Sequence, residues 1–142
     1  MADFMFNIAK GAFVEKVRDG ASNLGMLLLI AADTDDAMRD TDTVAALLAT
    51  SADEATDGSY ARKTGLTGTI TVDDTNNRVD VDIPDQTFTA LAGAAITDAV
   101  VFYQESAADS GRIPLTNHDF AITPDGSDVT AVVNAAGFAR AA

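Results

Sequence analysis

Alternating apolar and polar residues predict a β-hairpin near the middle of the chain. Residues 69–72 alternate between threonine and an aliphatic side chain, and residues 78–83 alternate between charged and aliphatic side chains. The five residues between them, 73–77, are Asp, Thr and Asn, which favour a hairpin loop. We expect Val79, Val81 and Ile83 to face one way, toward the core, and Asp80 and Asp82 to face solvent.

Other apolar segments predict further strands. Residues 26–32 and 99–103 are short and continuously apolar, as in strands that are buried on both faces. In residues 4–18, Phe4 and Phe6 stand two positions apart, which favours a strand. Shorter candidates separated by turn residues lie at 87–89, 113–115, 120–122 and 129–133. We interpret residues 137–140 as a tail.

One segment, about residues 41–50, has the pattern of a short helix. Thr41 or Asp42 can cap its first N–H groups, and Val44, Leu47 and Leu48 share one face. Together these elements predict a mainly β fold, a sandwich or barrel of short antiparallel strands with one short helix. We expect residues 1–142 to form a single domain, in which residues 1–20 are an extended N-terminal arm or an edge strand.

The composition permits a packed domain but argues against nucleic-acid and membrane partners. The 142 residues are 47% hydrophobic and 22% charged, and the formal net charge is -13. Nucleic acids and anionic lipids are bound by clusters of Lys and Arg, so we expect neither as a partner. The seven-residue apolar run at 26–32 is much shorter than the about 20 residues that cross a bilayer.

The absence of cysteine excludes disulfides, thiolate nucleophiles and cysteine-based zinc sites. Asp3 stands where a signal peptide carries a basic residue, so we expect synthesis in the cytoplasm without export by a classical signal. No motif for a cofactor is present, and we expect none. The glycine pair Gly65 and Gly68 lacks the Lys-Ser/Thr end of a phosphate-binding loop.

Two kinds of site remain open from residue types alone. His118 and Asp119 could form a catalytic pair, but no nucleophile-elbow motif accompanies them, and a hydrogen-bonding role in a loop is the commoner use of a lone histidine. Acidic clusters could bind calcium, although the same residue types make ordinary turns. These clusters are Asp33/Asp35/Asp36, Asp73/Asp74/Asn76 and Asp125/Asp128. We expect neither a catalytic nor a metal site.

The N-terminal segment is locally basic in an otherwise acidic chain. Lys10, Lys16 and Arg18 lie within nine positions, and Phe4 and Phe6 precede them. Exposed aromatic rings beside basic residues suit an interface anchor, so we predict that these five residues dock to an acidic partner. Burial in the core is the commoner explanation for any one of the phenylalanines.

Several strings along the chain resemble small virion proteins of the tailed phages and prophages of actinobacteria. The strings are residues 60–63, 72–88, 113–120, 125–126 and 137–140, and 72–88 is the most specific. The chain departs from the family pattern at three positions. Ser59 stands in place of an amide residue, Phe88 in place of Trp, and Ala139 in place of a second aromatic residue.

The resemblance implies a non-enzymatic capsid decoration, or cement, protein made in the cytoplasm of the bacterial host. Such a protein would bind the major capsid protein on the outer surface of the head, bridge neighbouring capsomers, and associate as a homotrimer. No catalytic residue is implied. The predicted contacts with the capsid or a neighbouring subunit are those of Phe4, Phe6, Lys10, Lys16 and Arg18. The alternative is a structural or receptor-binding component of the tail or fibre. A small hydrolase using His118 and a calcium-stabilised module are further alternatives.

Overall fold

The computed structural model describes residues 3–9 and 17–141, and its largest element is a six-stranded antiparallel sheet. The strand order is β1-β9-β8-β2-β3, and β4 also pairs with β2. The bounds are β1 (Phe4–Met5), β2 (Leu24–Ala31), β3 (Asp53–Glu54), β4 (Lys63–Leu66), β8 (Ile96–Gln104) and β9 (Arg112–Ile122). The prediction of a mainly β fold with antiparallel strands is confirmed.

The two most apolar strands lie at the centre of this sheet. Residues 24–29 of β2 are all buried, as are Val100, Val101 and Phe102 of β8. Side chains on both faces of these strands pack against other layers, which is why the sequence is continuously apolar there. Gly25 lies opposite Phe102, and a Cβ at this position would lie 2.3 Å from the Phe102 ring. The strand therefore requires glycine at that point.

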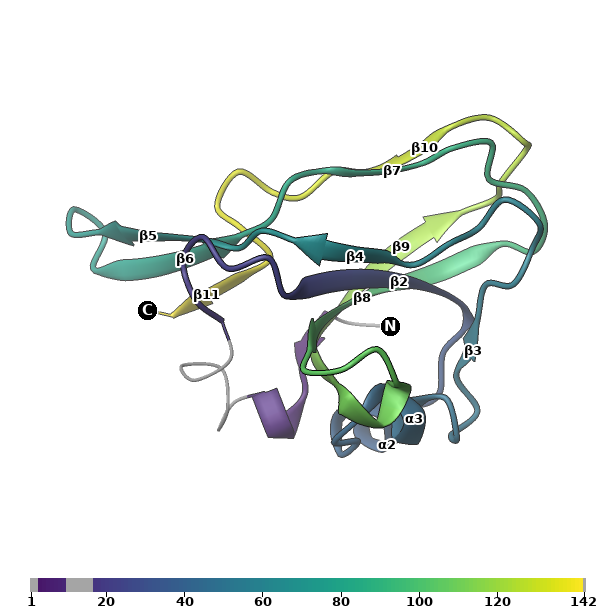
Figure 1. The fold of residues 1–142 in the computed structure, drawn as a ribbon, viewed down its shortest axis with the longest axis horizontal. Coiled ribbons are helices and arrows are strands. Elements are labelled where there is room, and N and C mark those ends of the chain that lie inside the picture. Colours follow the sequence, from purple (N-terminus) through teal and green to yellow (C-terminus); the bar gives the residue numbers. More distant parts are fainter. Residues whose placement is uncertain (1–2, 10–16, 142) are drawn as a thin grey trace.

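A layer covers each face of the main sheet (Figure 1). On one side lie the short helices α2 (Asp35–Arg39) and α3 (Val44–Leu47), with the 3-10 turn η1 (Asp109–Gly111) beside α3. On the other side lies the two-stranded ribbon of β7 (Gln86–Phe88) and β10 (Val129–Ala131). The arrangement is sandwich-like, with the buried apolar side chains in one cluster. No helix among the described residues meets the length and hydropathy needed to span a membrane.

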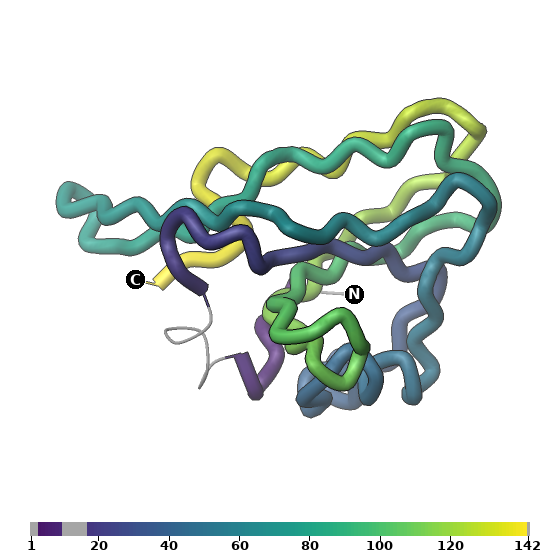
Figure 2. Tube along the Cα trace, in the orientation of Figure 1, coloured from purple at the N-terminus to yellow at the C-terminus, as the bar shows by residue number. Residues whose placement is uncertain are grey.

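A second sheet of three strands projects from one end of the molecule (Figure 2). It consists of β5 (Thr69–Asp73), β6 (Arg78–Asp82) and β11 (Ala139–Ala141), in the order β11-β6-β5. The pairing of β5 with β6 confirms the predicted hairpin. The prediction of a tail at 137–140 is wrong, because β11 pairs with β6 along its length.

The helical prediction was incomplete. The helix expected over about 41–50 is one turn, α3, and Thr43 caps it by accepting a hydrogen bond from the Ala46 N–H at 3.1 Å. Thr41 instead donates to the Met38 carbonyl. The sequence reasoning missed α2, which is capped by Thr34 and carries two acids in its first turn and Arg39 in its last. These are ordinary helix start and stop signals.

Strand β9 is one long strand where two short ones were predicted. Its polar middle resembles a break in the sequence, but Asn117 is fully buried and its Nδ2 donates to Asp98 of β8 at 2.8 Å. This bond satisfies the NH2 group of Asn117 inside the sheet, whereas its Oδ1 is buried without a hydrogen-bond partner among the described residues. At the chain start, β1 covers Phe4–Met5 only and forms the terminal strand of the main sheet.

Candidate functional site

A cavity of about 230 Å³ lies between the main sheet and the segment that follows β10. Its floor is apolar and comes from the sheet, with Met26 from β2, Ala99 and Val101 from β8, and Phe120 from β9. The facing wall is formed by residues 131–134 and by Gly137 and Phe138. Four segments, from β2, β8, β9 and residues 131–138, therefore build it, and no local pattern could have predicted it.

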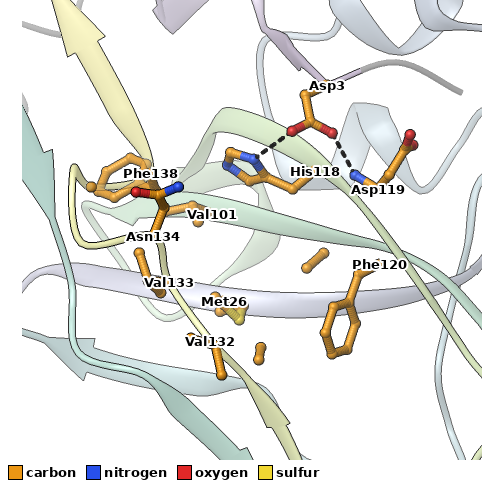
Figure 3. A pocket seen from close by; sticks show the side chains of 13 residues that line it. Asp3, Met26, Val101, His118, Asp119, Phe120, Val132, Val133, Asn134 and Phe138 are labelled. Carbon is orange, nitrogen blue, oxygen red and sulfur yellow. Dashed lines mark hydrogen bonds and ion pairs between the residues drawn. The ribbon is translucent and has the colours of Figure 1, made fainter.

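The rim of the cavity is polar on one side (Figure 3). Asp3 lies beside His118, and Asn134 stands on the opposite wall. The Asp3 carboxylate accepts a hydrogen bond from the Asp119 N–H at 2.7 Å. On the other wall, Val132 is 74% exposed and continues the apolar lining out to solvent.

His118 is held by two neighbours. Its Nδ1 lies 3.5 Å from Asp3 Oδ2, and its Nε2 lies 2.9 Å from the Thr116 hydroxyl. His118 belongs to strand β9 and not to a loop as expected. Thr116 is buried, and the described residues that line the cavity include no Ser, Thr, Cys or Lys side chain. Through its contact with Asp3, the ring links the residue before β1 to β9.

The structure changes the interpretation of the predicted interface residues. Phe4 is 8% exposed and Phe6 is fully buried, and their rings meet edge to face with centroids 5.2 Å apart. The proposed role of these two rings as exposed anchors is corrected, because both belong to the core. Arg18 is exposed. Lys10 and Lys16 lie outside the described residues.

The acidic clusters act as caps of loops and turns. Asp33 accepts from the N–H groups of Thr34 and Ser51, Asp73 from Asn76, and Asp125 from Ser127. These hydrogen bonds hold the pKa of each of the three carboxyls below its ordinary value. Within residues 3–9 and 17–141, no group of three acidic or histidine side chains is placed to hold a metal ion.

An ion-pair network ties β3 to η1 through Arg62. Its Nε lies 2.6 Å from Glu54 Oε1, and its Nη1 contacts Asp109. Hydrogen bonds to Glu54 and Asp109 raise the pKa of Arg62, and those from Arg62 and Arg112 lower the pKa of Asp109. The Tyr60 hydroxyl donates to Glu54 and accepts from the Leu28 N–H, and burial is the main cause that raises its pKa.

Most described cations pair within the chain. Arg78 and Arg140 both contact Asp80, which is 8% exposed, so the expectation that Asp80 faces solvent is wrong. Desolvation of this carboxylate is offset by two guanidinium groups. The other ion-paired arginines are Arg39, Arg62 and Arg112. The excess of acids therefore dominates the surface charge that a partner meets.

In comparisons with protein-family models, curated proteins and solved structures, nothing matches this chain.

Proposed function

We propose that this chain is a non-enzymatic decoration protein of a tailed-phage head, which binds the major capsid protein on the outer surface and bridges neighbouring capsomers. The observation that carries the proposal is the set of strings that resemble small virion proteins of actinobacterial phages. The fold class expected with it, a mainly β sandwich, is the one that the chain adopts.

The spatial arrangement of these strings supports the proposal. The strings at 72–88 and 137–140 are distant in sequence, yet they contain β6 and part of β11, which pair in the projecting sheet. The string at 60–63 contacts the string at 72–88 at the ring of Phe88. Tyr60 stacks on this ring at 6.0 Å between centroids, and Lys63 Nζ lies 4.9 Å from its centroid. The resemblance therefore falls on parts that fold against one another.

A capsid lattice gives such a small module the means to bind tightly. A homotrimer presents three copies of each weak contact, and the second and third contacts form at high effective concentration. Threefold symmetry also fits the threefold and quasi-threefold positions of a head. The net charge of -13 would keep decorated particles apart in solution.

The test is add-back to particles that lack the chain. Phage would be produced from a genome in which this reading frame is deleted, and purified tagged protein would be added to those particles. Antibody-gold labelling in electron micrographs should then cover the heads, and labelling should saturate with protein concentration. Deleted particles should also release DNA at a lower temperature than restored ones.

Labelling of tails or fibres would contradict the proposal and favour the alternative of a tail or receptor-binding component. Absence of any labelling, with deleted and parental particles equally stable, would remove a virion role altogether.

A further inference from the structure

The cavity between the main sheet and residues 131–138 has the form of a socket for one apolar side chain. Its volume of about 230 Å³ exceeds that of an engineered apolar cavity of about 150 Å³ that binds benzene. Met26 and Val101 present apolar groups from strands that are paired on both sides, and Phe120 adds its ring from β9. A leucine, methionine or phenylalanine side chain is of the size that fits.

The apolar surface extends beyond the cavity to the rim. Val132 is 74% exposed there, and of the described large apolar residues only Val72, on the projecting sheet, is comparably exposed. A side chain that enters the cavity would cover Val132 from solvent. Contacts of this kind, a buried apolar anchor with a polar rim, dominate the binding energy of protein interfaces.

The charge around the cavity favours certain residues beside the apolar side chain that enters it, which we call the anchor. Asp3 on the rim has 62% of its side chain exposed, and no Lys or Arg occurs among the described lining residues. The whole chain carries a net charge of -13. A partner segment with Lys or Arg beside its anchor is therefore attracted, and one with Asp or Glu is repelled.

We propose that this cavity is a docking socket for a segment of the partner protein that presents an apolar side chain flanked by Lys or Arg. The inference rests on the proposed function, since the partner is then the major capsid protein. The acidic rim speeds encounter with the basic residues, and the apolar insertion slows release.

The two exposed valines offer a matched test. Val132→Asp and Val72→Asp add the same charge at similarly exposed positions, but only Val132 lines the cavity. We expect Val132→Asp to weaken binding to chain-deleted heads at least about tenfold, and Val72→Asp to change it less than about twofold. Equal losses in the two variants would overturn the proposal.

A second matched pair tests the charge. Asp3→Asn and Asp74→Asn make the same change in net charge, at the cavity rim and in the hairpin loop respectively. Asp3→Asn should weaken binding to heads at least about twofold more than Asp74→Asn does. Equal losses of binding in the two variants would contradict the prediction that Lys or Arg flanks the anchor.

A measurement without heads separates this inference from the proposed function. The wild-type chain would be titrated with acetyl-Lys-Leu-Lys-amide and with acetyl-Glu-Leu-Glu-amide, and followed by nuclear magnetic resonance. The lysine peptide should cause saturable shifts at Ala99, Val101 and Phe120, and the glutamate peptide should not. Such shifts without binding to heads would refute the proposed function alone. Binding to heads without such shifts, and with equal effects of the two valine variants, would refute the socket alone.

Discussion

At the scale of single residues, Arg62 joins segments that are distant in sequence. It pairs with Glu54 of β3 and with Asp109 of η1, and 16% of its side chain is exposed. Glu54 has only 14% of its side chain exposed, and Asp109 has 34% exposed and also pairs with Arg112, so Glu54 depends more on the Arg62 guanidinium. A fork-shaped cation can serve two carboxylates at once, which a lysine ammonium does less well.

We therefore expect Arg62→Ala to lower the free energy of unfolding by about 2 kcal/mol, because Glu54 loses its ion pair and Asp109 loses one of its two. The free energy of unfolding of Arg62→Lys should lie between that of the parent and that of Arg62→Ala. Urea denaturation followed by circular dichroism measures the effect. Arg18→Ala, at an exposed arginine, is the control and should change the stability by less than about 0.5 kcal/mol. An Arg62→Ala protein as stable as the control would show that the network contributes nothing.

Asp109 makes stability depend on acid pH. Hydrogen bonds from Arg62 hold its pKa in the folded chain below the ordinary value of 3.8, so the unfolded chain takes up the proton more readily. The stabilisation is present above the ordinary value and is lost as pH falls toward the folded pKa. We expect Asp109→Asn to be less stable than the parent at neutral pH, and to lose less stability below pH of about 4. Urea midpoints across this range measure it. Asp74→Asn is the control, and parallel curves for Asp109→Asn and the parent would contradict the assignment.

At the scale of elements, the projecting sheet depends on a close approach of two backbones. Gly137 has φ of 85°, and a Cβ there would lie 2.1 Å from the Val81 carbonyl oxygen. The next residue, Phe138, donates its N–H to that same carbonyl at 2.9 Å. Glycine at 137 is therefore a condition for β11 to pair with β6.

Gly137→Ala should detach β11 from β6, whereas Gly126→Ala should not. Gly126 has φ of 90°, but a Cβ there meets nothing within 4 Å, so its variant carries the backbone strain without the clash. We expect about 1 kcal/mol of destabilisation from Gly126→Ala and at least about 2 kcal/mol more from Gly137→Ala. Amide hydrogen exchange at residues 138–141 should rise in Gly137→Ala alone. Equal exchange in both variants would show that the close approach is unimportant.

Sequence patterns predicted the elements whose signal is local. The β5–β6 hairpin follows from alternation plus a loop, and β2 and β8 follow from continuous apolar runs. Strand β11 was missed because its partner lies more than fifty residues earlier, and the Asn117–Asp98 pair makes β9 continuous through a polar stretch. Helix α2 was missed although Thr34 and Arg39 signal its ends. The cavity requires the tertiary structure, since Met26, Val101 and Val132 meet only after folding.

At the scale of the whole molecule, self-association works against a large net negative charge. The charge of -13 repels a second copy, so contacts between subunits must bury surface where carboxylates are few or paired. Asp80 and Asp109 are examples of paired acids, because each forms an ion pair with an arginine of the same chain.

We expect the purified chain to form a homo-oligomer, with three copies as the predicted number. Light scattering coupled to size-exclusion chromatography should give a multiple of the 14.7 kDa chain mass. Added salt should favour association, because it screens repulsion between acidic subunits. A single-chain mass at high protein concentration and high salt would contradict the trimer and leave capsid binding to be tested separately.

The most direct measurement for the central claim is a difference density map between virions from the parental genome and virions lacking this chain. The account predicts extra density at repeated positions on the outer surface of the head, into which this β fold fits, in contact with more than one capsid subunit. Extra density confined to the tail or fibre, or maps that are identical, would contradict it.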